Sequence, residues 1–266
     1  MRFKSIFWLF NIVVFIALAV IVAGSIIILG EDSISLFWKN MWFMIVVFAA
    51  VVGILDAYFI RNWKLFTYLE NEDWASLLAW LEEQLYIKHR LNQAYANLLI
   101  NTALTVSNYE SVKKLEKEIR TRKPVLLRHV GVSLGIPLFR ERNAEAIKNF
   151  YGPLAEDPKT KQRSWAKWAN AQASGENGIS ELTELLDDRD PAVVLLSINV
   201  LENYLSVLDD NTLYKLQETK NIMAEKLKGS SGEKLLNRSR EENLLASVLS
   251  SWVEQSRKRL LGLPVQ

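Results

Sequence analysis

The stretch Ser107-Asn108-Tyr109-Glu110 has two counterparts in the chain, Glu72-Asp73-Trp74-Ala75 and Glu141-Arg142-Asn143-Ala144. Each opens an apolar-periodic segment after a polar turn, which is the pattern of a helix N-terminus. The three stretches begin 35 and 34 residues apart. A signal that recurs at a fixed distance of this size indicates a repeat architecture, in which each unit buries its apolar face against its neighbour.

The sequence beyond Arg61 has the pattern of helices throughout. Apolar residues recur there three and four positions apart, and no convincing alternating strand or hairpin interrupts them. The prolines share the period, because Pro158 follows Pro124 by 34 residues and Pro191 follows Pro158 by 33. We therefore predict an all-α fold for residues 61–266.

Two segments in particular have a recognisable pattern of turn, helix and closing proline. One runs from Asn108-Tyr109-Glu110 through Ile119 to Pro124, and the other comprises Ala144-Glu145-Ala146-Ile147, Phe150, Leu154 and Asp157-Pro158. Accompanying first helices are marked by Ala96, Leu99, Ile100 and Ala103, and by Trp165, Trp168 and Ala169. Over roughly residues 60–190 the chain resembles the tetratricopeptide repeat family, whose unit is a helix–turn–helix of about 34 residues. The resemblance implies an α-solenoid with a concave surface that binds protein segments.

Three features depart from the family pattern and carry structural expectations. Glu116 stands where the family has an apolar or aromatic residue. Gly131, Gly135 and Pro137 fall where a first helix is due, which predicts a short or kinked helix. Gly152-Pro153 predicts an interruption of the next helix, because proline lacks the N–H that continues the hydrogen-bond ladder.

Toward the C-terminus the pattern changes. Ile179 to Val193 resembles a HEAT-type repeat, in which an apolar helix ends in an acidic turn and Asp190-Pro191 opens the next helix. Asp190 is expected to cap the free N–H groups, and Pro191 suits the first helical position. Both families build α-solenoids, so the two resemblances differ in subtype and agree in architecture.

The final helix is predicted from Ser239 onward, since Ser239 and Glu242 have the spacing of a capping box. One apolar stripe follows, made of Leu244, Leu245, Val248, Leu249, Trp252 and Val253. Cations come last, where the helix dipole favours them: Arg257, Lys258 and Arg259. We interpret this segment as a helix that closes the stack. The alternative is an amphipathic helix that binds a partner or a membrane surface.

Residues 1–60 have the pattern of a transmembrane helical hairpin. Ile6 to Leu29 is a run of 24 residues without a formal charge, and Met41 to Ile60 is a run of 20 whose one charge is Asp56. A helix of 20 residues spans about 30 Å, the thickness of a bilayer core. A signal peptide is the alternative for the first run, but the run exceeds a typical h-region. No Gly or Pro follows the second run before Leu69, which predicts one continuous helix from about Trp38 to Leu69.

Basic residues flank the hairpin on one side of the membrane. They are Arg2 and Lys4 before the first helix and Arg61 and Lys64 after the second. The connection between the helices carries Glu31, Asp32 and only Lys39. Basic residues that flank membrane helices normally remain on the cytoplasmic side. We therefore expect both termini and the domain of residues 61–266 to be cytoplasmic. The hairpin is then expected in a bacterial inner membrane or its equivalent.

Two polar side chains lie within the hairpin, Asn11 and Asp56. In antiparallel helices they fall at similar depth near the cytoplasmic face. We expect an interhelical hydrogen bond, or contact of Asp56 with interfacial water. The alternative is an ion or proton path, which normally uses more polar residues deeper in the span.

A basic stretch begins after Ser111 and consists of Lys113, Lys114, Lys117, Arg120, Arg122 and Lys123, with Arg128 beyond. Glu110, Glu116 and Glu118 dilute it. The ordinary interpretation is a solvated helix face, and the functional alternative is contact with anionic lipid headgroups or an acidic partner. With a net charge of +2 for the whole chain and no interleaved aromatic residues, nucleic-acid binding is not expected.

The residue inventory restricts the chemistry of the chain. It has no cysteine and two histidines, and it lacks nucleotide-binding, zinc-protease and serine-hydrolase motifs. We therefore expect no enzyme activity, no cofactor and no metal. Five tryptophans are expected to pack in the core, with a ligand groove as the alternative: Trp74, Trp80, Trp165, Trp168 and Trp252.

Together these features favour a membrane-anchored scaffold or adaptor that binds protein partners through its helical repeats. The alternative is a structural subunit of a membrane transport, channel or secretion complex, in which the hairpin itself is functional. The sequence leaves open whether the chain acts as an oligomer or within a larger membrane complex.

Overall fold

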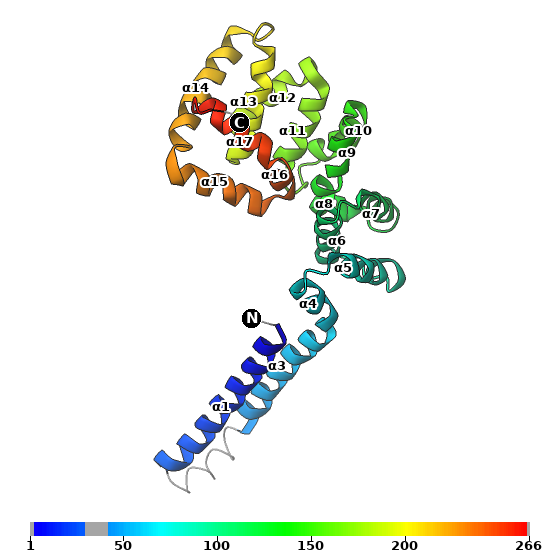
Figure 1. Ribbon diagram of the computed structural model, residues 1–266, viewed down its shortest axis with the longest axis vertical. Coiled ribbons are helices and arrows are strands. Elements are labelled where there is room, and N and C mark those ends of the chain that lie inside the picture. Colours follow the sequence, from blue (N-terminus) through cyan, green and yellow to red (C-terminus); the bar gives the residue numbers. More distant parts are fainter. Residues whose placement is uncertain (1–2, 30–41, 265–266) are drawn as a thin grey trace. The chain divides into compact units, whose positions relative to one another are not determined.

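The computed structural model describes residues 3–29 and 42–264, and every regular element in these two ranges is a helix (Figure 1). The all-α fold predicted from the periodicity is therefore confirmed for these ranges. The chain divides into two compact units, Met1–Trp80 and Leu81–Gln266. Each is described by itself.

The first unit begins with two long helices, α1 (Phe3–Leu29) and α3 (Trp42–Arg61). Two shorter helices follow, α4 (Trp63–Glu70) and α5 (Trp74–Glu82), the second of which ends in the other unit. The ring of Phe7 packs edge-on against Phe59 at 5.9 Å and Trp63 at 5.7 Å. These aromatic contacts fix α1 beside the junction of α3 and α4.

The continuous helix expected as far as Leu69 is interrupted at Asn62. Helical segments Ile45–Arg61 and Trp63–Glu70 meet there at 59°. The Asn62 backbone has φ −100° and ψ 12°, and its Nδ2 donates a hydrogen bond to the Tyr58 carbonyl at 2.8 Å. Such side-chain bonds to the preceding turn compete with the helical ladder and bend it. The expected beginning of this helix, between Trp38 and Met41, lies outside the described residues.

The hydropathy of the first unit bears on the predicted membrane spans. Among the residues that the structure describes, no single helix has both the length and the apolar character of a membrane span. The bent pair Ile45–Arg61 and Trp63–Glu70 reaches both criteria together, by length and composition.

The second unit continues with short and medium helices joined by tight turns. Their bounds are η1 (Glu83–Ile87), α6 (Gln93–Thr105), α7 (Tyr109–Arg122), η2 (Pro124–Leu126), α8 (Leu127–Leu134), α9 (Ile136–Glu141), α10 (Ala144–Glu156), α11 (Arg163–Ser174), η3 (Gly175–Gly178), α12 (Ile179–Glu184), η4 (Leu185–Asp187), α13 (Pro191–Leu201), η5 (Glu202–Tyr204), α14 (Asp210–Lys226), α15 (Gly229–Glu242), α16 (Leu244–Val248) and α17 (Ser250–Leu260).

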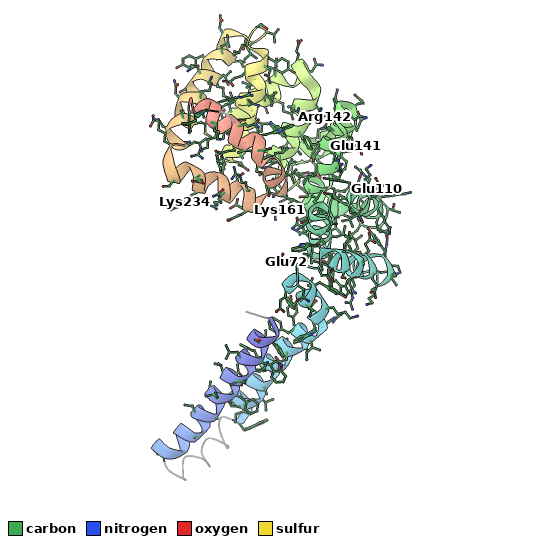
Figure 2. All side chains as sticks on the ribbon, viewed as in Figure 1. Glu72, Glu110, Glu141, Arg142, Lys161 and Lys234 are labelled. Carbon is green, nitrogen blue, oxygen red and sulfur yellow. The ribbon has the colours of Figure 1, made fainter. Side chains whose placement is uncertain are left out.

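The three recurring sequence stretches form the same turn. In each, the residue before the cap has a left-handed backbone: φ is 52° at Glu72, 57° at Ser107 and 52° at Arg142. Figure 2 labels the first and third of these residues. The next residue then caps the following helix, because a side-chain oxygen of Asp73, Asn108 and Asn143 accepts the N–H of Ser76, Ser111 and Ala146 at 3.1, 3.2 and 3.0 Å. The sequence period therefore corresponds to a repeated local structure.

The short helix predicted at Gly131, Gly135 and Pro137 is confirmed, since α8 ends at Gly135 and α9 begins directly after it. A close approach by Tyr151 of α10 accounts for the glycine. A Cβ at Gly135 would lie 2.5 Å from the tyrosine Cζ. The Tyr151 hydroxyl donates a 2.8 Å hydrogen bond to the Val132 carbonyl, so the ring has no freedom to retreat without losing that bond.

The interruption predicted at Gly152-Pro153 is wrong, because α10 continues through Pro153 to Glu156. Proline normally crowds the Cβ of the residue before it, and Gly152 has none. Pro153 also lies in the last turn, where its missing N–H affects only the end of the ladder.

The cap predicted at Asp190 is confirmed. Its Oδ1 accepts the Ala192 N–H at 3.0 Å, and Pro191 opens α13. The same carboxylate accepts a hydrogen bond from Trp165 Nε1 at 2.8 Å and another from Ser239 Oγ at 2.6 Å. One side chain thus joins α11, α13 and α15.

The capping box predicted at Ser239 and Glu242 is wrong, because both residues lie in the last turn of α15. The hydroxyl that a cap needs is already bonded to Asp190, and Asn243 caps α16 by accepting the Leu245 N–H at 2.8 Å. The predicted single stripe is divided between α16 and α17. Its members Leu245, Leu249 and Val253 are buried, whereas Val248 and Trp252 are each 45% exposed.

Candidate functional site

The two polar residues of the predicted hairpin meet in the first unit. Asn11 on α1 donates through Nδ2 to Asp56 Oδ1 on α3 at 3.3 Å, and the same amide contacts the Phe7 carbonyl at 3.1 Å. Both side chains are partly buried. The pair ties α1 to α3, and its geometry is that of a packing contact between helices.

The basic stretch lies on α7, and carboxylates of the second unit neutralise much of it. Lys113 contacts Glu141 at 2.8 Å and Glu110 at 3.3 Å, and these hydrogen bonds raise the lysine pKa. Arg120 pairs with Glu116 at 2.7 Å, and Arg122 pairs with Glu118 at 2.6 Å. The last two pairs span four positions of one helix, so the acidic residues that dilute the stretch also occupy its cations.

The remaining cations of the stretch have other contacts. Lys114 lies 4.3 Å from the centre of the Tyr86 ring, and Lys123 donates to the Leu91 carbonyl at 3.2 Å. Arg128 pairs with Asp157 at 2.8 Å. Lys117 has no ionic partner among the described residues. Among the described residues Lys114, Lys117 and Lys123 therefore have no carboxylate partner, and the lipid or acidic-partner alternative for this helix stays a prediction.

Another site in the second unit involves Trp168 and Trp252, two of the tryptophans for which a ligand groove was the alternative to core packing. A cavity of about 230 Å³ opens between α11, α13 and α17. Its lining is rich in amide and tryptophan side chains: Trp168, Gln172, Leu196, Asn199, Val200, Asn203, Trp252, Gln255, Ser256 and Arg259.

A second cavity, of about 280 Å³, adjoins the first. Gln172 and Trp252 line both, and the other lining residues come from α9 to α11: Phe139, Arg142, Ala144, Ile147 and Ala173. Figure 2 labels Arg142, which lines this second cavity only. We call the two cavities together the tryptophan groove. All of its residues belong to the second unit.

Packing beneath the groove fixes the orientation of Trp168. Its ring stacks on Phe139 with centroids 6.0 Å apart and planes 16° apart, and it meets Trp165 edge-on at 6.2 Å. The side chain is buried, yet its Nε1 has no hydrogen-bond partner in the described ranges. A buried N–H without an acceptor is uncommon, since it costs about 1–3 kcal/mol.

The charge of the groove is one-sided. No aspartate or glutamate lines either cavity, whereas Arg142 lines one and Arg259 lines the other. Arg259 donates to Asn199 Oδ1 at 3.0 Å, and neither arginine has an ionic partner among the described residues. The groove therefore offers cations and N–H donors to an incoming group, with amide oxygens as its acceptors.

A sequence signal for this groove exists in hindsight. Trp168/Gln172, Asn199/Asn203 and Gln255/Arg259 are each four positions apart, so each pair shares one helix face. The core-packing prediction holds for Trp80, Trp165 and Trp168, which are buried. Trp74 is only partly buried, and the prediction is wrong for Trp252, which is 45% exposed. Periodicity alone gives no reason for amides on three separate helices to converge.

The described residues contain no group of three or more His, Asp or Glu side chains arranged to hold a metal ion. His129 is exposed on α8. Asp188 and Asp190, at the acidic turn, accept hydrogen bonds from Ser164 and Trp165 and serve as structural acceptors.

Comparisons with known proteins give one family. The sequence model of the family described as "Uncharacterised Treponema protein" matches residues 111–261, a range that contains every residue of the tryptophan groove. An "Uncharacterized protein" of Treponema pallidum (strain Nichols) is 23% identical over 165 residues, which are 60% of this chain and 52% of that protein. The chain thus spans about half the length of the curated relative it matches. No solved structure matches.

Proposed function

We propose that this chain, which belongs to the family described as "Uncharacterised Treponema protein", is a membrane-anchored adaptor. Its N-terminal helices hold it in a cytoplasmic membrane, and its helical domain binds a protein partner on the cytoplasmic side. One observation carries the proposal: the distribution of polar and apolar side chains in α1 and α3.

In these two helices the large apolar side chains face outward and the polar pair lies between the helices. Phe15 is 76% exposed and Ile54 is 69% exposed, while Asn11 and Asp56 bond to one another. Apolar surface in water is unfavourable by about 25 cal/mol for each Å². Hydrocarbon reverses this preference and penalises unpaired polar groups, so the arrangement supports a lipid environment.

The basic flanks supply the orientation of the proposal. Arg2, Lys4, Arg61 and Lys64 lie outside the apolar runs on the side where both termini emerge. The positive-inside bias then assigns the helical domain to the cytoplasm.

The repeated turns support an α-solenoid as the architecture of the adaptor. Caps at Asp73, Asn108 and Asn143 are spaced 35 residues apart, and each opens the second helix of a pair. Stacked helix pairs expose extended surfaces that bind protein segments. A transport role for the hairpin finds no comparable support, because the amide of Asn11 is occupied by Asp56 and Phe7.

The membrane anchor is tested by two matched charge insertions. Phe15→Arg places a cation on an exposed face of α1, at a cost of about 2.5–3.5 kcal/mol if that face meets lipid. Tyr214→Arg is the control, since Tyr214 is 70% exposed, close to the 76% of Phe15, but lies on α14. We expect only the Phe15 variant to be lost from alkali-washed membranes. Equal retention of both variants contradicts a lipid-facing α1.

Topology and partner are tested in intact cells. Protease added outside the cytoplasmic membrane is expected to spare residues 61–266, and digestion of that region contradicts the orientation. Crosslinking in native membranes, followed by mass spectrometry, is expected to recover a reproducible protein partner bound to the helical domain. Repeated failure to recover one contradicts the adaptor role.

A further inference from the structure

The tryptophan groove has a set of unused hydrogen-bonding groups and one sign of charge. We propose that it binds an extended acidic peptide segment, whose main chain contacts the amide side chains and whose carboxylates contact Arg142 and Arg259. This inference rests on the proposed function for the presence of a protein partner, and it adds the chemistry of that partner.

The amide side chains match the repeating group of a peptide. Each amide carries a donor and an acceptor, as a peptide unit does, so one side chain can bond both groups of one peptide unit. Gln172 and Gln255 make no side-chain hydrogen bond within the described chain. They come from α11 and α17, which places free amides on two walls of one cavity.

The buried indole N–H of Trp168 lacks a hydrogen-bond acceptor in the described ranges. Its ring is held by Phe139 and Trp165, so it cannot turn toward another partner without breaking that packing. The Nε1 atom itself has almost no exposed surface, so a backbone carbonyl of a bound segment supplies the missing oxygen only if the side chains that cover Nε1 move aside. Trp252, shared by both cavities and 45% exposed, offers an apolar surface to a side chain of the same segment.

The charges select the sign of the ligand. Arg142 and Arg259 line different cavities, no carboxylate lines either, and both guanidinium groups lack ionic partners in the described ranges. A segment with acidic residues on both sides of an apolar one suits this layout. Nucleic acid normally requires more cations than two, and a neutral sugar leaves both arginines without a counter-charge.

The binding test uses the full-length chain in nanodiscs of neutral phosphatidylcholine. Three pools of labelled nine-residue peptides are offered: one randomised over Asp, Glu, Leu, Phe, Ser and Gly, one with Asn and Gln in place of the acids, and one with Lys in their place. We expect binders in the acidic pool only, with affinity that falls as salt increases. No binder in the acidic pool, or equal binding from the other two, overturns the proposal. A chitooligosaccharide and a single-stranded oligonucleotide are offered in the same assay. Tighter binding of either one than of the acidic peptides overturns the proposal in favour of another ligand class.

Variants connect the binding to the groove. Arg142→Gln with Arg259→Gln is expected to weaken the enriched peptide at least about tenfold, and Trp168→Phe, which keeps a ring but removes the N–H, about five- to tenfold. Trp252→Ala is expected to weaken the same peptide. Because Trp252 is 45% exposed, this variant should fold even if the Trp168 variant does not. Arg238→Gln is the control, because Arg238 is exposed on α15 and lines neither cavity. Unchanged affinity in the double arginine variant and in Trp252→Ala overturns the assignment to this groove.

The failure of this inference is distinguishable from failure of the adaptor role. If crosslinking recovers the same partner from the double arginine variant and from the unmodified chain, the adaptor role stands and the groove is not its binding site. If the acidic peptides bind but no partner is recovered from native membranes, the groove assignment stands and the adaptor role fails.

Discussion

The junction of α11, α13 and α15 depends on one carboxylate, and Asp190→Asn tests it. Asparagine keeps the size of the side chain and one carbonyl oxygen, which still accepts from the Ala192 N–H and from Ser239. Its amide nitrogen replaces the oxygen that accepts from Trp165 Nε1 at 2.8 Å. Two donors then face one another, and the indole N–H of a fully buried tryptophan has no acceptor.

The expected loss of stability follows from this geometry. An orphaned buried N–H costs about 1–3 kcal/mol, and replacing charge-assisted bonds by neutral ones adds about 1 kcal/mol. The helix cap itself survives, because asparagine caps as well as aspartate. We therefore expect Asp190→Asn to destabilise the second unit by about 2–4 kcal/mol. Asp190→Ala also removes the cap and should cost about 1 kcal/mol more.

Urea unfolding of the detergent-solubilised chain, followed by circular dichroism at 222 nm, measures these losses. Asp187→Asn is the control, since its exposed pair with Lys215 is worth at most about 1 kcal/mol. A double-mutant cycle with Trp165→Phe isolates the indole bond. Without the N–H, Asp190→Asn should cost at least about 1 kcal/mol less than it does in the unmodified chain. Equal costs in the two backgrounds refute the assignment of the effect to Trp165.

The remaining predictions concern packing, acid stability and the hairpin. Gly135→Ala places a Cβ 2.5 Å from Tyr151 and should destabilise by about 1–3 kcal/mol in the same urea assay, with Gly53→Ala, where space is open, as the control. Hydrogen bonds from the Thr212 hydroxyl and N–H lower the pKa of Asp209, so its stabilising contribution is present above the ordinary aspartate pKa and is lost as pH falls through the lowered value. Asparagine caps a helix as well as aspartate but does not titrate. Asp209→Asn should therefore leave the thermal midpoint at pH 7 unchanged and reduce the decline of that midpoint on acidification. The same decline in the variant and in the unmodified chain contradicts a stabilising role for the charged Asp209. Asn11→Leu should lower the yield of disulfide crosslinking between one cysteine introduced into α1 and one introduced into α3, measured in membranes. An unchanged yield contradicts a packing role for the bond of Asn11 to Asp56.

Local signals near helix ends were the most reliable part of the sequence. The polar residue before each repeated helix predicted its start, because Asp73, Asn108, Asn143 and Asp190 need only their own backbone neighbours to act as caps. Gly135 likewise marked the end of a short helix, although the close approach that excludes a larger side chain there comes from Tyr151 of α10. The caps are decided within a few residues, so a single sequence carries the information needed to predict them.

Two of the wrong predictions, at Ser239 and Asn62, depend on side-chain hydrogen bonds that helical periodicity does not contain. Ser239 has the spacing of a cap, but its hydroxyl bonds to Asp190, 49 positions earlier, and α15 continues through it. Asn62 looked like an ordinary helical residue, yet its side chain bonds to Tyr58 where aromatic rings from α1 pack beside the break. Helical periodicity records neither a hydroxyl that bonds to another element, as at Ser239, nor a side-chain bond to the preceding turn, as at Asn62.

The groove shows the same difficulty for a binding site. Trp168 and Trp252 have similar sequence surroundings, each on an amphipathic helix with another apolar residue three or four positions away. One is buried with an unsatisfied N–H, and the other remains nearly half exposed beside it. Leaving a large apolar ring in water and an indole N–H without an acceptor are both unfavourable, by about 1–3 kcal/mol each. A single ligand can relieve the first cost with an apolar side chain on Trp252, and the second with a main-chain carbonyl once the side chains that cover Nε1 move aside. The two defects therefore argue for one peptide-like occupant more strongly than either tryptophan does alone.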